Sequence, residues 1–506
     1  MRAWAARRFE PRDLVAGVSV ALVLIPQSLA YAQLAGMPAV RGLYASAIPP
    51  LAAAPFSSSP YLQPGPTAVS ALLTFGALAP LAAAGSPEYV ALGLALALVV
   101  GVVRVLVGLL RAGVIAYLIS QPMLLGFVPA AGILIIASQL PLVLGVEPPE
   151  GGVLRRAAWA IVHPGDWRLA AIVLSLGIGV LLFVGPRLHA LVPVVLLAVG
   201  GGIAYSELAD YSGPTVGSIS AGFPPFSFDL PWTELPSLLL AGTVIALLGF
   251  AEAASIARTY AALERKPWDP NREFIGQGMA NVAAAVSGGF PVGASFSRSA
   301  LNRLAGARTS FSTIVTGVAV LAFLPAASVL SPLPQAVLAT VVVVAVAGLV
   351  RPLPMLRLWR YSEPQFAVAA TTFALTLALS PHIERAVIVG IVLSVALHLF
   401  RELSLEVPSW TEGDTLHLRP RGVLWFGSAA RLEDTFLELV GEHPDTGRLA
   451  VHLDGLGRID MTGALALRGL LQGAREAGLK VEVLDVRPRW RGLVARVIAR
   501  EDDPLG

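Results

Sequence analysis

Apolar runs separated by short polar stretches fill the first 401 residues of the chain, and they thin out abruptly after that point. A helix that crosses a bilayer needs about 20 largely apolar residues. The pattern predicts spans or shorter apolar segments at 14–35, 39–54, 88–111, 114–122, 124–145, 169–184, 188–204, 237–257, 273–287, 310–330, 335–350, 363–380 and 383–400. The first region is therefore predicted to be a polytopic, all-α membrane domain.

Two further segments are too short to span and begin with helix-breaking residues. One is Gln63-Pro64-Gly65-Pro66-Thr67 and the apolar residues after it, and the other opens with Gly288-Gly-Phe-Pro291-Val-Gly-Ala-Ser295-Phe-Ser297-Arg298-Ser299. Proline and glycine exclude a helix at the start of each, so we expect half-helices over 64–75 and 291–303. Ser295 is the expected N-cap of the second half-helix.

The start of the second half-helix has the composition of an anion site. A helix N-terminus presents free N–H groups and partial positive charge. Arg298 and the hydroxyl groups of Ser295, Ser297 and Ser299 lie at or beside this end. We expect these groups to bind an anion at the middle of the membrane.

The two half-helices occupy corresponding places in two halves of the membrane domain. Each half has two spans followed by a broken segment, which gives about fourteen segments in total and two units of seven. Since seven is odd, tandem units are inverted relative to each other, at approximately 12–205 and 236–401. Paired interrupted segments of this kind indicate the midplane binding site of a secondary transporter.

Composition and charge agree with a membrane domain followed by a different domain. The chain has 506 residues, of which 55% are hydrophobic and 14% are charged, and its mean hydropathy is +0.72. Residues 402–506 hold 30 of the 69 charged residues, so we divide the chain into 1–401 and 402–506. The absence of cysteine excludes thiol chemistry. The seven histidines show no ligand spacing, so no metal or other cofactor is expected.

Basic residues predict the orientation in the membrane. Arg2, Arg7, Arg8 and Arg12 precede the first span, and Arg258, Arg265, Lys266 and Arg272 surround a later loop. By the positive-inside rule, the N-terminus and that loop are cytoplasmic, and loop 205–236, which has no Lys or Arg, is outside. About fourteen segments also place the C-terminus in the cytoplasm.

The last hundred residues alternate between strands and helices. Period-two apolar runs predict strands within 415–425, 449–453 and 480–485, and helices are expected at about 429–441, 461–477 and 489–500. This order predicts a small α/β domain.

Several motifs resemble a known family. Ser28-Leu-Ala-Tyr31-Ala-Gln-Leu-Ala-Gly36-Met-Pro38, the two half-helix segments and Leu453-Asp-Gly-Leu-Gly-Arg-Ile-Asp460-Met-Thr462-Gly463 occur in the order found in the sulfate permease/solute carrier anion transporter family. The last motif resembles that of the STAS domain. The resemblance implies seven plus seven inverted repeats with core and gate subdomains, a fold shared with nucleobase transporters, and a cytoplasmic STAS domain. It also implies a homodimer in a prokaryotic inner membrane.

The resemblance carries site residues over to this sequence. Gln27 and Tyr31 match positions on the first segment that line the site, and Thr67 matches the first helical turn of the third segment. Glu252 matches the acid of the eighth segment, and Ser297 with Arg298 matches the pair on the tenth. In the STAS motif, Met461-Thr462 stands where soluble regulators have two small hydroxyl residues, so only Thr462 could accept a phosphate.

Each candidate residue has a structural alternative. Arg298 either binds the anion or forms a buried ion pair with an acid such as Glu252. Glu252 either takes up a proton together with the anion or is a fixed carboxylate bonded to amide groups. Arg104 is predicted to snorkel toward the membrane surface, which leaves one cation in the site. Gln277 and Asn281 are expected to form helix–helix hydrogen bonds.

We expect a secondary transporter of a small anion that works by alternating access with proton symport. Candidate substrates are sulfate, bicarbonate and dicarboxylates such as fumarate, with a carboxylate favoured. Alternatives are a sodium-coupled bicarbonate or sulfate transporter, an uncoupled channel, and a regulatory scaffold with vestigial transport. Arg298 argues against a nucleobase carrier, and no Ser/His, paired-Asp or metal arrangement at one depth suggests an enzyme. Expected partners are the anion, the proton, membrane lipid, a second copy and a possible cytoplasmic protein bound by the STAS domain, with no nucleic acid.

Overall fold

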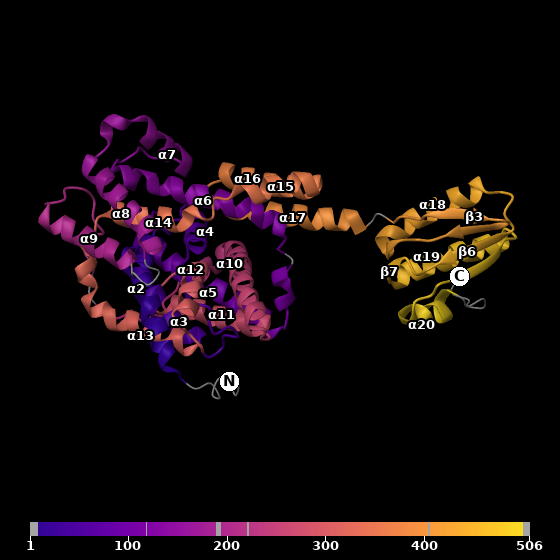
Figure 1. Cartoon of the computed structure of the whole chain (residues 1–506), viewed down its shortest axis with the longest axis horizontal. Coiled ribbons are helices and arrows are strands. Elements are labelled where there is room, and N and C mark those ends of the chain that lie inside the picture. The colour runs from indigo at the N-terminus through magenta and orange to yellow at the C-terminus, as the bar shows by residue number, and fades with distance from the viewer. Residues whose placement is uncertain (1–8, 118, 189–193, 220–221, 403–404, 499–506) are drawn as a thin grey trace. The chain divides into compact units, whose positions relative to one another are not determined.

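A computed structural model describes residues 9–117, 119–188, 194–219, 222–402 and 405–498. The chain forms two compact units, 1–391 and 392–506, which are described separately (Figure 1). The boundary between them falls inside one long helix, Ile383–Glu402, instead of after residue 401. Arg2, Arg7 and Arg8, which predicted a cytoplasmic N-terminus, lie outside the described residues.

The membrane unit contains seven helical segments from each repeat in the described part of the chain. Those of the first repeat are α2 (Pro11–Leu34), α3 (Ala39–Ala53), α4 (Ala68–Leu78), α5 (Pro87–Leu109), α6 (Gln121–Leu144), α8 (Leu169–Leu188) and α9 (Val194–Leu208). Those of the second are α10 (Leu235–Glu264), α11 (Pro270–Val286), α12 (Phe296–Leu304), α13 (Phe311–Phe323), α14 (Gln335–Ala347), α16 (Glu363–Ala378) and α17 (Ile383–Glu402). The half-helices α4 and α12 are the third segment of each set, as predicted.

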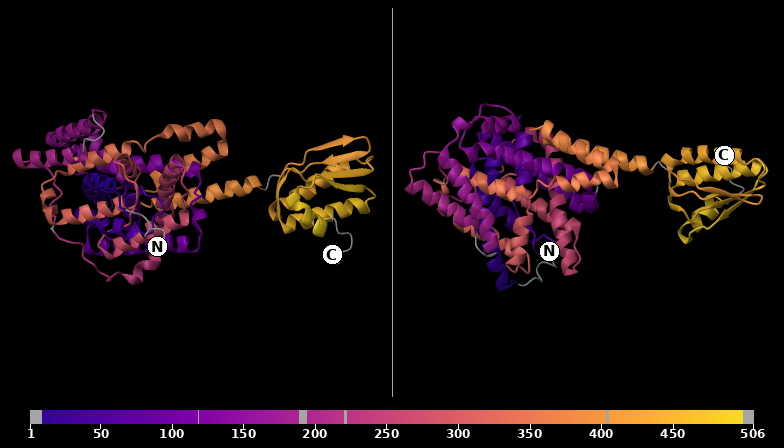
Figure 2. Two further views of the ribbon diagram at one scale, coloured as in Figure 1. Left: turned by 60° about the horizontal axis from the view of Figure 1, so that its bottom comes forward. Right: turned by 45° about the horizontal axis from the view of Figure 1, so that its top comes forward.

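The contacts between helices divide them into two bundles that each draw on both repeats. Figure 2 shows helices from early and late parts of the chain, in indigo to purple and in orange, mixed within the membrane unit. The core subdomain consists of α2 to α5 with α10 to α13, and α5 packs along α10 and α11. The gate subdomain centres on α6, which packs against α14 and α16, while α8 packs against α14. Because each bundle mixes the repeats, the core can carry both half-helices as one body.

Glycines bring α5 and α11 into close contact. A Cβ at Gly101 would lie 2.7 Å from the backbone nitrogen of Val282, and one at Gly278 would lie 2.8 Å from that of Val105. Small residues allow this approach, which is how helices pack tightly where lipid removes the hydrophobic driving force.

Two helices lie where the sequence predicted loops. These are α7 (Val153–Val162) and α15 (Pro352–Tyr361), which carry apolar residues on one face and arginines on the other. They are too short to span a bilayer, and helices of this kind lie along its surface. The sequence pattern did not predict these helices because each has ten residues and contains arginines.

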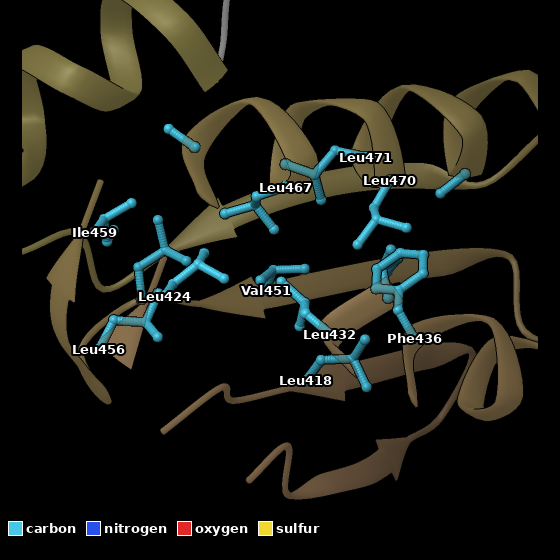
Figure 3. Close-up of a cluster of buried hydrophobic side chains, with 14 of the residues drawn as sticks. Leu418, Leu424, Leu432, Phe436, Val451, Leu456, Ile459, Leu467, Leu470 and Leu471 are labelled. Carbon is cyan, nitrogen blue, oxygen red and sulfur yellow. The ribbon is translucent and has the colours of Figure 1, made fainter. Parts of the chain in front are cut away.

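The second unit is an α/β domain. Its main sheet has the order β3 (Ser409–Glu412), β4 (Thr415–Leu418), β6 (Arg448–His452) and β8 (Lys480–Leu484), and β5 (Gly422–Leu424) pairs with β7 (Leu456–Ile459). The helices α18 (Phe426–Glu442) and α19 (Met461–Glu476) pack their leucines against the sheet (Figure 3).

The predicted strands and helices of this domain are largely confirmed, with three differences. The sequence did not predict β3 or β7, which are four-residue strands. The helix expected at 489–500 is helical but of mixed type, with a 3₁₀ turn at Pro488–Trp490, α20 (Arg491–Leu493) and a π-helical turn at Val494–Ile498, and residues 499–500 lie outside the described ones.

Candidate functional site

The two half-helices start from a short strand pair that joins the repeats. Strand β1 (Pro64–Gly65) precedes α4 and strand β2 (Gly293–Ala294) precedes α12. They pair in antiparallel fashion, with Pro64 opposite Ala294 and Gly65 opposite Gly293. The N-termini of α4 and α12 therefore meet at one place in the core subdomain.

Hydrogen bonds from the second repeat hold the chain that enters β1. The backbone nitrogen of Gln63 donates to Ser299 Oγ at 3.3 Å, and Asn302 Nδ2 donates to the carbonyl of Tyr61 at 3.2 Å. Thr313 Oγ1 donates to the carbonyl of Leu62 at 3.2 Å. Buried backbone groups in a membrane need such partners, so this irregular segment is stable only against α12 and α13.

The first half-helix is capped by a side chain and the second is not. Thr67 is the N-cap of α4, where its hydroxyl accepts from the Ser70 backbone nitrogen at 3.2 Å and donates to Ser70 Oγ at 2.9 Å. It thus precedes the first helical turn, in which the resemblance placed it. Ser295 occupies the N-cap position of α12, but its side chain makes no cap bond and instead lies 3.1 Å from Ser297 Oγ.

Arg298 is buried beside the strand pair without a hydrogen-bond partner. Its exposed fraction is 0%, and none of its three guanidinium nitrogens is hydrogen-bonded to any described residue. Nη2 lies 3.4 Å from the point where a Cβ of Gly65 would stand, and the guanidinium lies within electrostatic range of the Glu252 carboxyl group. A buried charge without hydrogen bonds is costly, so this guanidinium is poised for an anionic partner.

The predicted residues of α2 lie at the same depth of burial. Gln27 and Tyr31 are each 6% exposed, and Gln27 Oε1 has no hydrogen-bond partner among the described residues. They are one helical turn apart, which places them on one face of the helix. By contrast, the Ser297 side chain is exposed, so it differs from Arg298 in its access to solvent.

A cavity of about 700 Å³ opens toward this site, and Glu252 lies in its wall. Its other walls include Val69 at the start of α4, Phe296 at the start of α12, Gln121 of α6 and Thr259 of α10. Among the predicted site residues in the described chain, Glu252 lines this cavity, and the lining does not include Gln27, Tyr31, Thr67, Ser295, Ser297 or Arg298. The cavity lies between the core and gate subdomains.

The snorkelling prediction for Arg104 is wrong. Arg104 is 0% exposed and donates three hydrogen bonds to backbone carbonyls, from Nε to Ala246 at 3.0 Å, from Nη1 to Val292 at 2.9 Å and from Nη2 to Ile245 at 3.3 Å. The core therefore contains a second buried cation besides Arg298. Helical position alone did not reveal that α10 and β2 pack on this side of α5.

Asn281 has a different role from the predicted helix–helix bond. Its Oδ1 accepts from the Val292 backbone nitrogen at 2.9 Å, and its Nδ2 donates to the Val292 carbonyl at 3.0 Å. It thus fixes the peptide that precedes β2. Gln277 lies one turn away, and neither atom of its side-chain amide has a partner among the described residues.

The motif of the C-terminal domain shapes loops. Asp460 is the N-cap of α19, accepting from the Gly463 nitrogen at 2.7 Å, and Thr462 is exposed in the first turn. Arg419 donates from Nε to Asp454 Oδ1 at 2.9 Å, which holds the pKa of Asp454 below its ordinary value. This pair therefore stabilises the folded domain at neutral pH and loses its effect as the pH falls through that lowered pKa.

Fourteen segments in two inverted repeats, with two half-helices meeting inside a core bundle, define a secondary transporter of the membrane. The profile of the Sulfate permease family matches residues 11–372, and the chain belongs to this family. It is accordingly an integral membrane protein and an anion transporter rather than an enzyme, since its relatives are transporters.

Relatives and solved structures agree with this assignment. The chain is 33% identical to "Probable sulfate transporter MT1781" of Mycobacterium tuberculosis over 78% of this chain and 71% of that protein. It is also 33% identical to "Sulfate transporter 4.1, chloroplastic" of Arabidopsis thaliana over 76% of this chain, but spans just 57% of that longer protein. The fold resembles the murine Solute Carrier 26 family member A9 anion transporter in the inward-facing state, with a TM-score of 0.88, 20% identity and coverage of 98% and 89% of the two chains. The transmembrane domain of the cyanobacterial bicarbonate transporter BicA gives 0.65 at 24% identity over 76% of this chain and 97% of that one.

Proposed function

We propose that this chain couples proton entry to the uptake of a small oxyanion or carboxylate by alternating access. The observation that carries the proposal is the Arg298 guanidinium, which is fully buried and without a hydrogen-bond partner at an uncapped half-helix. Free amide groups, the partial positive helix end and the guanidinium all favour negative charge at one point. The relatives named as sulfate transporters make sulfate the first candidate, followed by bicarbonate and fumarate.

Glu252 is proposed as the group that takes up the proton. It lies in the cavity wall and interacts electrostatically with Arg298. When Glu252 is charged it competes with the anion for that guanidinium, and protonation removes this competition. Proton and anion entry are thus favoured together, which is the thermodynamic requirement for symport.

Gln27, Tyr31, Thr67, Ser295 and Ser297 are proposed as the polar lining of the site. The structure refines their roles. The Thr67 hydroxyl proton points to Ser70, so Thr67 supports the half-helix more than it offers a donor to the anion. Gln27 retains an unpaired oxygen, and its amide group is free to turn toward a bound ligand.

The function is tested by the uptake of labelled sulfate, bicarbonate and fumarate into proteoliposomes, first without sodium, with and without an inward proton gradient, and then with an inward sodium gradient. We expect the gradient to stimulate uptake of one of these anions. Uptake that requires sodium would move the coupling role away from Glu252. Fast flux that ignores both gradients would favour an uncoupled channel.

We further propose an inner-membrane protein with both termini in the cytoplasm, assembled as a homodimer, with the cavity open to the cytoplasm. The cavity runs toward Thr259, near the end of α10 where Arg265 and Lys266 follow. Since the chain has no cysteine, Thr259→Cys can be labelled selectively. An impermeant thiol reagent should modify it in inside-out vesicles and leave it intact in right-side-out vesicles. The reverse pattern would overturn the orientation.

A further inference from the structure

Arg104 and Arg298 both approach the strand pair. Nη1 of Arg104 donates to the carbonyl of Val292, the residue before β2, while Arg298 Nη2 approaches Gly65 of β1. Gly65 is the pairing partner of Gly293, which directly follows Val292. The two guanidinium groups therefore lie near one pair of residues, although they come from helices in different repeats.

The two arginines differ in their hydrogen bonding. Arg298 has no partner, whereas all three nitrogens of Arg104 donate to carbonyls of α10 and Val292. Such carbonyls have a second lone pair beyond the one used in the helix, so they can accept these bonds without breaking α10. The arrangement keeps the Arg104 charge in a fixed position.

The Arg104 charge is not neutralised by a carboxylate. The ion pairs in the described part of the chain do not include Arg104, and its partners are neutral carbonyl groups. The chain also makes room for the side chain, because a Cβ at Gly249 would stand 2.6 Å from its Nη2. A buried charge of this kind leaves positive potential in the low-dielectric core.

We propose that Arg104 is a positioning residue of the anion site whose fixed charge raises the affinity for doubly charged anions above that for singly charged ones. It acts through β2 and α10, by holding the peptide of Val292 and the carbonyls of Ile245 and Ala246, which lie about two turns before Glu252, and it does not contact the anion. This inference rests on the proposed function, because it concerns the same site. A unit charge about 10 Å from a ligand, at an effective dielectric constant of about 20, changes the affinity per ligand charge by about tenfold.

The experiment compares a charge-removing and a charge-conserving substitution of Arg104 in the full-length purified chain. Anion binding is measured as the thermal stabilisation produced by titrating sulfate against bicarbonate, and fumarate against monomethyl fumarate, at one pH. In each pair, the first anion carries two negative charges and the second carries one. Arg104→Gln should lower the ratio of dianion to monoanion affinity by about tenfold, and Arg104→Lys, which keeps the charge, should preserve the ratio. Arg111→Gln is the matched control, because it removes an exposed cation seven residues further on.

A purely structural role predicts a different result. Arg104→Gln would then weaken both anions equally, and an unchanged ratio would overturn the proposal. If Arg104→Gln does not give a monodisperse protein, Arg104→Met is the second neutral variant, for which a lowered ratio supports the proposal and an unchanged ratio overturns it. A wild-type chain that responds to no anion would contradict the proposed function, whereas an unchanged ratio contradicts the role of Arg104 alone.

Discussion

The two half-helices occupy equivalent places in the inverted repeats but differ in chemistry. The first, α4, is apolar and starts with Thr67, whose hydroxyl satisfies the Ser70 nitrogen. The second, α12, is polar and starts with Ser295, which makes no cap bond, and it carries the unpaired Arg298. Pseudo-symmetry thus brings two positive helix ends together, and a side chain caps one of them while the other has no side-chain cap.

This difference indicates that the two repeats contribute differently to stability and to the availability of hydrogen-bond donors. A capped N-terminus adds stability, and an uncapped one keeps donors available at a cost in stability. Four predictions follow from this contrast, in order of decreasing effect.

Removal of the Arg298 charge at the start of α12 should have the largest effect on transport. Arg298→Ala should reduce anion uptake by at least about a hundredfold, because it deletes a desolvated cation from the site. The melting temperature should not fall, since an unpaired buried charge is removed. The reduced uptake and the melting temperature are both measured on the same preparation, by transport assay and by thermal unfolding. Arg303→Ala, at the partly exposed far end of α12, is the control, and comparable loss there would remove Arg298 from its special position.

Neutralisation of Glu252 should change the coupling more than the binding. Glu252→Gln keeps the shape of the side chain but cannot release a proton, so the pH dependence of uptake should flatten and gradient stimulation should disappear. The measurement is initial uptake at several external pH values. Glu264→Gln, twelve residues further along α10, should keep the wild-type profile. A pH profile unaltered by Glu252→Gln would contradict proton coupling through this residue.

Substitution of the two N-cap residues should affect the stability of the protein more at Thr67 than at Ser295. Thr67→Ala should lower the free energy of unfolding by about 1 kcal/mol, whereas Ser295→Ala should change it by no more than a few tenths. The reason is that Thr67 makes the cap bond and Ser295 does not. Thermal unfolding in one detergent compares the pair. Equal losses would show that Ser295 caps α12 in solution.

Deletion of 402–506 should have the smallest effect on the site. Neither half-helix lies in the C-terminal domain, so the order of preference among sulfate, bicarbonate and fumarate should not change. Assembly or rate should decrease if the domain supports the homodimer. Competition assays on the truncated chain give the order, and a switch in preference would mean that the second domain shapes the site.

Much of this architecture could be predicted from the sequence because it depends on local signals. Apolar run length predicted most segments, and Pro64 and Pro291 marked the two breaks in the helices. The region around Arg298 could be predicted for the same reason, since a helix end and its charge lie within a few residues.

The remainder depends on contacts between distant segments. The fate of Arg104 is decided by carbonyl groups 141 to 188 residues away, and the bond between Asn281 and Val292 requires a turn that periodicity does not describe. The absence of a cap bond at Ser295 is equally invisible, because the residue type favours a cap and the rotamer forms none.

The strand pair that joins the repeats has a consequence for the order of biogenesis. Gly65 pairs with Gly293, so the partner of β1 is made 228 residues later. At translation rates of about 5 to 20 residues per second, this delay is roughly 10 to 50 seconds. During that time the backbone around β1 has no β2 to bond in the bilayer, where unpaired polar groups are unfavourable. The strand pair, and with it the meeting of the two half-helix starts, can therefore form only after the beginning of the second repeat has been made.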